Sequence, residues 1–270
     1  MYGIEEGLID WNFSIFDEGF FTLPEDGRIY RDWKEGGHGN TNLFKAITQS
    51  SNTYFFDLAY RSDINQLKKH LSSLGFGDKA CIDCFEEDQV FVPEPSWKMN
   101  KHNFGWFKGD TVNMGVGQGY LVSTPIQLAK YAYIMANKGK FSDLSLKKDL
   151  VKREKSIEFN KFSNDDWFKL HESMVNVIEG NTGTARRLRE RKNYIVAAKT
   201  GTAELVSGDN REQYSETRLD DNLRDHALII AFGPMPNPRY AVSVVVENGE
   251  SGGSVAGPVA ISVLNSLIQE

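Results

Sequence analysis

The sequence predicts a mixed α/β domain of the α+β kind, in which helices are followed by an antiparallel meander. Three observations predict this class. Apolar residues recur at helical spacing through the first two thirds of the chain, three β-branched runs follow one another near its end, and the last apolar segment has the pattern of a covering helix. With 270 residues, 40% of them hydrophobic, the chain can bury a sizeable core in one domain.

The first part of the chain combines a turn-rich segment with helices. Residues 12–39 are aromatic and rich in turn formers, which predicts short strands and loops. The helix that follows is capped by Asn40 or Thr41, and another starts after the sequence QSSN. The apolar spacing over residues 64–74 predicts an amphipathic helix that Gly75 ends.

The middle of the chain alternates between connectors and helices. Residues 91–110 contain prolines and several basic side chains, which predicts a long loop. Thr124 caps a helix that ends at Gly139, because proline in a first turn and glycine after a last turn mark those two ends. Residues 140–162 form a charged connector, after which Ser163 caps a further helix.

Three β-rich runs close the chain, over residues 194–199, 227–232 and 240–246. The sequence PMPNPR between the last two is a hairpin-type turn, so an antiparallel meander is expected. Residues 254–270 have the pattern of a terminal helix.

Composition excludes several classes of protein. The net charge is −6 and the pI is near 5.5. No run of Lys or Arg is long enough to follow a phosphate backbone, so nucleic acid is not an expected partner. No stretch approaches the length of a transmembrane helix, and the N-terminus lacks the basic and apolar blocks of a signal peptide, so this chain shows no signal or anchor.

Two further motifs have weak functional interpretations. The sequence GVGQG fails the dinucleotide-loop pattern because Tyr120 stands at the third glycine position, and a backbone-permissive loop is favoured. The pair Cys81 and Cys84 is half a zinc site, a redox pair or an incidental pair in a loop. We favour the last, because no second C-x-x-C and no βαβ pattern accompanies it.

Residues 193–206, NYIVAAKTGTAELV, set an apolar run against a lysine, two threonines and a glycine. At the wall of a cleft, Gly201 would let a ligand approach the backbone, nearby N–H groups would hold an oxyanion, and Lys199 would attract a carboxylate. These features suit a serine acyl-transferase, although an isolated K-T-G favours a solvated surface turn. Ser50 and Asn52 form the S-x-N element that accompanies K-T-G in penicillin-interactive enzymes, and their joint occurrence favours the enzyme.

The chain resembles the transpeptidase domain of class B penicillin-binding proteins, most closely the penicillin-binding protein 2 branch of the rod-elongation system. The resemblance covers almost the whole chain. It rests on YRDWKEGGHGN, SSNTYFFDLAY, GDTVNMGVGQGYLVSTPIQLAKYAYIMANKG, GTARR, AAKTGTAELV, RDHALIIAFGP and VVVENG. It implies the penicillin-binding protein and serine β-lactamase fold, with a mainly helical lobe and an N-terminal loop region over 1–192, and a β-meander with a C-terminal helix over 193–270.

The resemblance also implies roles for individual residues. Ser50 would relay protons, Asn52 would hold the substrate amide, and Lys199 would set the electrostatics of the cleft. Thr200 and Thr202 would meet the terminal carboxylate of a D-Ala-D-Ala donor, and the Thr202 N–H would be half of an oxyanion hole. The reaction implied is transfer of a stem peptide to an acceptor amine, which β-lactams would block.

One departure from the family pattern concerns the nucleophile. The family carries it in a Ser-x-x-Lys motif ahead of S-x-N, and no such motif precedes Ser50. The literal match at residues 145–148 lies in the charged connector and is attributed to chance. We therefore expect that Met1 lies just after the nucleophile, that the first strands and the nucleophile helix are missing, and that this chain alone is inactive. The strand over 240–246, or its neighbour, is then expected to show an unpaired apolar edge.

A metal site is a further implication of the resemblance. Some family members hold a metal ion with residues matching Asp17, Asp32 and His38 and with a cysteine at the position of Ser51. A neutral hydroxyl is a weaker zinc ligand than a thiolate, so hydrogen-bonded loop residues are the favoured interpretation here and zinc the alternative. No other cofactor is required.

Three functions therefore remain open. The first is a fragment of a D,D-transpeptidase that faces the periplasm from the inner membrane, with peptidoglycan stem peptides, β-lactams and membrane proteins of the elongation machinery as partners. The second is a non-catalytic module that binds stem peptides or elongation proteins. The third, a serine β-lactamase or D,D-carboxypeptidase, shares the motifs but not the flanking sequence.

Overall fold

The computed structural model describes residues 1–148, 153–205 and 223–268. Its N-terminal part begins with the short helix α1 (Tyr2–Glu5) and contains two small antiparallel sheets. Strand β1 (Ser14–Asp17) pairs with β4 (Gly39–Asn42), and β2 (Phe20–Thr22) pairs with β3 (Ile29–Arg31). The short strands predicted between residues 12 and 39 are thereby confirmed.

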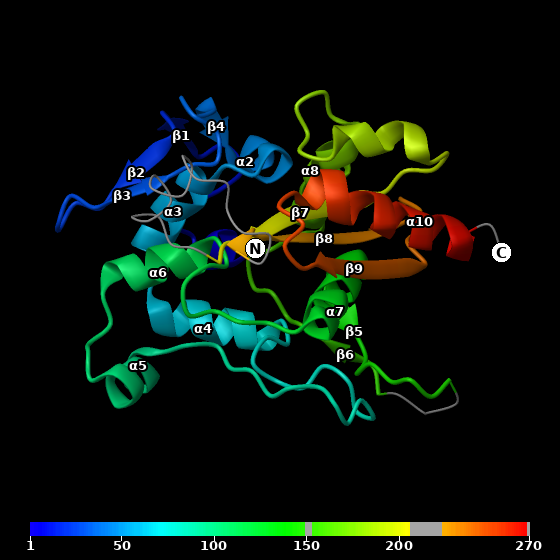
Figure 1. Ribbon diagram of the computed structural model, residues 1–270, viewed down its shortest axis with the longest axis horizontal. Coiled ribbons are helices and arrows are strands. Elements are labelled where there is room, and N and C mark those ends of the chain that lie inside the picture. The colour runs from blue at the N-terminus through cyan, green and yellow to red at the C-terminus, as the bar shows by residue number, and fades with distance from the viewer. Residues whose placement is uncertain (149–152, 206–222, 269–270) are drawn as a thin grey trace.

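Three helices follow, of which the first two pack against these small sheets and the third lies below them in Figure 1. They are α2 (Leu43–Gln49), α3 (Asn52–Arg61) and α4 (Ile64–Ser73). Helix α2 begins later than expected, since Asn42 is its N-cap and accepts a hydrogen bond from the Lys45 N–H. Helix α4 has the predicted start, because the Asp63 carboxylate accepts hydrogen bonds from two backbone N–H groups of its first turn.

The prediction of a loop over residues 91–110 is wrong. The segment contains α5 (Pro95–His102) and the start of α6 (Lys108–Gly115). Proline at the first position of α5 is compatible with a helix, because that N–H has no intrahelical partner. A nearly buried ion pair between Lys98 and Asp110, 2.5 Å long, links the two helices. The spacing of apolar residues in the sequence did not predict this pair.

The main sheet lies on the right of Figure 1 and has the order β7–β8–β9, antiparallel throughout. Strand β8 (His226–Gly233) is central, and β9 (Tyr240–Val246) has the predicted bounds. Strand β7 (Ala197–Ala203) begins three residues later than predicted and extends further. The K-T-G residues therefore lie inside a strand and not at its end, as the pairing of Lys199 with Ile230 shows.

The two faces of the sheet belong to different cores. Alternate strand residues point to opposite faces, so neighbours such as Ala197 and Ala198 join different clusters. Helices α7 (Pro125–Ala136) and α8 (Asn164–Glu179) cover one face, and α10 (Gly257–Ile268) covers the other (Figure 1). The helices predicted at Thr124, at Ser163 and near the C-terminus are confirmed.

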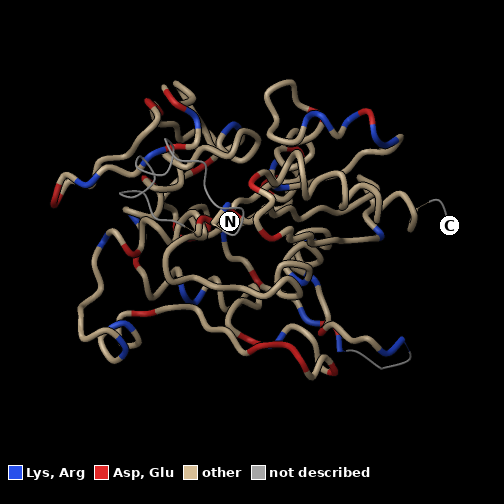
Figure 2. Tube along the Cα trace, viewed as in Figure 1, with Lys and Arg blue, Asp and Glu red and all other residues tan. Residues whose placement is uncertain are grey.

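Two short helical elements and two strand fragments complete the described chain. A 3₁₀ helix η1 (Arg186–Arg191) follows α8, and a π-helical turn η3 (Gly252–Ala256) precedes α10. Within the charged connector, β5 (Lys140–Phe141) pairs with β6 (Lys155–Ser156). Figure 2 shows basic and acidic residues interspersed over the described chain, with a basic run at η1.

Two structural findings concern the cysteine pair and the length of the helices. Cys81 and Cys84 form a disulfide, which excludes the reduced pair as the state of this structure. Among the described residues, no helix has the length and apolar character needed to cross a membrane.

Candidate active site

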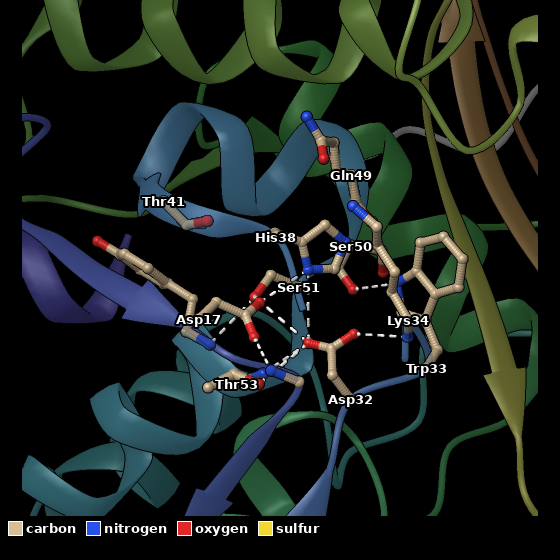
Figure 3. A network of polar contacts seen from close by, with 12 residues as sticks. Asp17, Asp32, Trp33, Lys34, His38, Thr41, Gln49, Ser50, Ser51 and Thr53 are labelled. Carbon is tan, nitrogen blue, oxygen red and sulfur yellow. Dashed lines mark hydrogen bonds and ion pairs between the residues drawn. The ribbon is translucent and has the colours of Figure 1, made fainter. Parts of the chain in front are cut away.

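The S-x-N element lies at the junction between α2 and α3, as predicted. Ser50 ends α2 in the left-handed conformation, with φ 58°, and Ser51 caps α3 by accepting a hydrogen bond from the Tyr54 N–H. A non-glycine residue at positive φ is strained by roughly 1–3 kcal/mol and persists only where its surroundings hold it. Trp33 supplies such a hold, since its indole N–H lies 2.9 Å from the Ser50 carbonyl and 3.2 Å from the Gln49 carbonyl (Figure 3).

The K-T-G strand meets the S-x-N junction through Lys199. Its Nζ donates to Ser50 Oγ at 2.6 Å and to the Thr200 carbonyl at 2.9 Å. Burial of the amine lowers the pKa of Lys199 to about 8, because an ammonium loses hydration among protein atoms. The two motifs, 149 residues apart in sequence, therefore form one polar site with a lysine that is close to giving up its proton near neutral pH.

The other predicted residues lie on the same two elements. Asn52 is the first residue of α3, and within the described part of the chain its side-chain amide makes no hydrogen bond to protein, which leaves it available for a ligand. Thr202 is exposed on β7, and its carbonyl accepts a hydrogen bond from Gln118 Nε2 at 3.0 Å. Gly201 lies against η3, whose Gly252 has no room for a side chain: a Cβ at Gly252 would lie 2.7 Å from the Gly201 carbonyl oxygen.

Sequence reasoning missed several residues around this site. Trp33 holds the Ser50 carbonyl, Gln118 holds β7, and Thr184 Oγ1 lies 2.7 Å from Thr200 Oγ1. Gln118 belongs to the GVGQG loop and Thr184 to GTARR, so both lie in segments that carried the resemblance. Their partners are distant in sequence, and no local pattern could have identified them.

The literal Ser-x-x-Lys match does not join the site. Ser145 Oγ donates to Asp83 Oδ2 at 2.7 Å, beside the Cys81–Cys84 disulfide loop. The interpretation of this match as chance therefore agrees with its place in the connector.

Asp17, Asp32 and His38 form a buried cluster around Ser51, the neighbour of Ser50 (Figure 3). Asp17 ends β1, Asp32 follows β3, and His38 precedes β4, so the two small sheets bring them together. His38 Nδ1 lies 2.7 Å from Asp17 Oδ2 and 3.8 Å from Asp32 Oδ2. Ser51 Oγ donates to the same Asp17 oxygen at 2.7 Å.

The cluster has the composition of a divalent-cation site. Two carboxylates share a pocket of which Asp17 is fully buried, and their candidate ligand atoms and that of His38 all lie within 4.8 Å of one another. His38 Nε2 is buried and has no hydrogen-bond partner among the residues that the structure describes. Burial alone would raise the pKa of Asp17, but hydrogen bonds from Ser51, the Gly19 N–H and His38 hold it below its ordinary value. The carboxylate is therefore ionised, as a metal ligand must be.

A lysine of a K-T-G edge strand in contact with the serine of an S-x-N helix junction defines a class of protein. A family model for the penicillin binding protein transpeptidase domain matches residues 1–265, and the chain belongs to this family. Its fold is the transpeptidase fold, with helices and antiparallel sheets.

The branch of the family is that of penicillin-binding protein 2, also called MrdA. The chain is 36% identical over 273 residues to the peptidoglycan D,D-transpeptidase MrdA of Haemophilus influenzae, covering 98% of this chain and 42% of the relative. It is 34% identical to Pseudomonas aeruginosa PBP2 in complex with WCK 5153, with a TM-score of 0.88, covering 100% of this chain and 58% of that one. For PBP2 complexed with MreC from Helicobacter pylori, the identity is 30% and the TM-score 0.87, over 99% of this chain and 48% of that one.

Proposed function

We propose that this chain supplies most of the substrate cleft of a peptidoglycan D,D-transpeptidase, which transfers stem peptides from D-Ala-D-Ala donors. The observation that carries the proposal is the 2.6 Å contact between Lys199 Nζ and Ser50 Oγ, which joins the two motifs. The chain spans less than half the length of the MrdA relative, so the activity of the whole protein is part of this proposal.

The chemistry divides among the residues already placed. An amine whose pKa is about 8 can exchange a proton with Ser50, which can pass it to a leaving group. Asn52 is free to bind the amide of the donor, and Thr202 is exposed to meet its carboxylate. Gly201 lets the donor lie close to β7, whose outer edge pairs with no strand among the described residues.

The nucleophile is the group that residues 1–270 do not supply. No Ser-x-x-Lys precedes Ser50, and acyl transfer needs an activated serine beside the base. We therefore propose that the isolated polypeptide binds donors and β-lactams without forming a covalent adduct. The structure of Pseudomonas aeruginosa PBP2 in complex with WCK 5153 supports ligand binding by this branch of the family.

A chimera tests this function. The segment of Haemophilus influenzae MrdA that precedes the matched region is fused to residues 1–270, and labelling by a fluorescent penicillin is measured. We expect covalent labelling of the chimera, loss of at least tenfold in rate on Lys199→Ala, and no labelling of residues 1–270 alone. A chimera that folds but is not labelled, or whose labelling does not depend on Lys199, would contradict the proposal.

The partner and the location follow from the same relatives. The complex of Helicobacter pylori PBP2 with MreC supports an elongation-machinery protein as partner of the longer protein. We place the cleft on the periplasmic face of the inner membrane, where peptidoglycan donors lie. A pull-down of the longer protein with the cognate MreC-type protein, with residues 1–270 as the comparison, measures whether this part takes part in the contact.

We further propose that Asp17, Asp32 and His38 hold a Zn²⁺ ion, with Ser51 as a weak fourth ligand. The ion would neutralise two buried carboxylates and join β1, β4 and the start of α3. These residues would then fix the S-x-N junction from behind, because Ser51 is the neighbour of Ser50. Metal analysis of the purified protein and its melting temperature with and without a chelator test this. A protein that melts at the same temperature and contains no zinc would contradict it.

A further inference from the structure

The segment of residues 182–184 lies between the two motifs of the cleft. It follows α8, and it contacts both elements through threonine hydroxyls. Gln49 Nε2, one residue before Ser50, donates to Thr182 Oγ1 at 3.0 Å. Thr184 Oγ1 lies 2.7 Å from Thr200 Oγ1 on β7. Neither contact takes part in the chemistry proposed above for the cleft.

The backbone of this segment has little freedom. A Cβ at Gly183 would lie 2.3 Å from the carbonyl oxygens of Asn176 and Val177, so the end of α8 packs directly against it. A Cβ at Gly253 would lie 2.5 Å from the Thr184 carbonyl oxygen, so η3 packs against it from another side. Because its backbone is wedged between two elements, Thr184 presents its hydroxyl to Thr200 in one direction.

Only one of the two facing hydroxyls can donate its hydrogen to the other, and which one donates decides what Thr200 can offer a ligand. Each hydroxyl carries one hydrogen, and either oxygen of the Thr184–Thr200 pair could be the donor. If Thr200 donated to Thr184, it would offer only lone pairs to an anion and would repel a carboxylate. If Thr184 donates, the hydrogen of Thr200 is free to point toward the ligand, and the donated bond polarises that hydroxyl further.

We propose that Thr184 is a positioning residue for the carboxylate subsite of the cleft. It donates to Thr200 Oγ1, fixes the rotamer of Thr200, and directs the Thr200 hydroxyl hydrogen to the terminal carboxylate of a D-alanyl-D-alanine donor. The proposal rests on the function proposed above for the ligand, but the rotamer of Thr200 is a property of the chain alone.

The first measurement needs no ligand. Three-bond couplings to the Thr200 methyl group, measured by NMR on residues 1–270 with labelled threonine, report its χ1 rotamer. We expect one rotamer in the unmodified chain and in Thr184→Ser, and averaging in Thr184→Val, which keeps the shape but lacks the hydroxyl. Thr22→Val, on the exposed face of β2, is the matched control. A single rotamer retained in Thr184→Val would overturn the positioning role. If the valine variant does not fold, Thr184→Ala takes its place.

The second measurement uses the probe Nα-acetyl-D-alanyl-D-alanine and its C-terminal amide. NMR titration gives the ratio of the two affinities, which isolates recognition of the carboxylate. We expect the unmodified chain to prefer the free acid, and Thr184→Val to reduce this preference roughly three- to tenfold, the size of one hydrogen bond. Thr184→Ser restores it.

The outcomes separate the two proposals. If the unmodified chain prefers the acid but Thr184→Val does so equally, Thr184 has no part in the subsite and the inference fails while the function stands. If the unmodified chain shows no preference for the acid, the carboxylate site of the proposed function fails. The rotamer measurement then still decides whether Thr184 positions Thr200.

Discussion

Lys199→Met is expected to make the protein more stable at neutral pH and less stable at high pH. Burial lowers the pKa of Lys199 from 10.5 to about 8. At pH 7 the folded state therefore contains a buried ammonium, which destabilises it relative to the unfolded state. At 1.36 kcal/mol for each pH unit, this difference corresponds to about 3 kcal/mol of lost stability below pH 8. Methionine has a similar length and no charge, so the variant does not have this destabilisation.

The same substitution also removes two hydrogen bonds. Lys199 Nζ donates to Ser50 Oγ and to the Thr200 carbonyl, and bonds of this kind contribute about 1 kcal/mol each. At pH 7 the variant should therefore gain about 1 kcal/mol on balance. Above pH 10.5 the buried charge is absent from both states of the wild type, only the lost bonds count, and the variant should be about 2 kcal/mol less stable.

Urea denaturation of both proteins at pH 7, 8.5 and 10 measures this change. The unfolded chain binds more protons than the folded chain between pH 8 and 10.5, so wild-type stability should rise across that interval relative to the variant. Lys169→Met is the control, since the hydrogen bond that Lys169 donates to the Asp165 carboxylate raises the pKa of this exposed lysine. A stability difference between wild type and Lys199→Met that is the same at all three pH values would refute the assignment of Lys199 as a buried, easily deprotonated amine.

Three other predictions follow from the described residues. Asp17→Asn should lower the free energy of unfolding by roughly 3 kcal/mol at pH 7, because it breaks a buried charged network, and the difference should disappear as the pH falls through the lowered pKa of Asp17. Urea denaturation from pH 3 to 7 checks both, and an unchanged or higher stability at pH 7 would contradict the role of the cluster. Reducing the Cys81–Cys84 disulfide should change stability by no more than about 2 kcal/mol, since the bridged cysteines are only 3 residues apart, and melting with and without reductant measures this; a larger loss would mean that the loop supports the core. No strand pairs with the outer edge of β9 in the part of the chain that the structure describes, so residues 1–270 should associate at high concentration; a single monomeric species in sedimentation velocity at every concentration would argue against an exposed pairing edge.

Local signals in the sequence were enough for most elements with clear ends. Thr124, Ser163 and Asp63 cap helices where capping rules placed them, because the cap depends on the first turn alone. The strand Tyr240–Val246 was predicted to the residue, since it is bounded by turn formers on both sides. The sequence period failed over 91–110, where proline suggested a loop and the stabilising partner, Asp110 for Lys98, comes from the next helix.

The sequence by itself determined the residue types of this site and their membership in a family. S-x-N, K-T-G and their flanking segments are local patterns, and each carries its chemistry within a few residues. The sequence also determined that no Ser-x-x-Lys precedes Ser50, since that is a matter of reading the chain.

Only the tertiary structure decided how those residues act on one another. Lys199 and Ser50 are in contact although they are 149 residues apart in sequence. The Thr184–Thr200 pair likewise depends on the end of α8 packing beside β7. The lowered pKa of Lys199 is likewise a property of its buried surroundings and not of the K-T-G motif. Burial and long-range contact arise when separate elements pack together, and for that reason no local pattern could specify them.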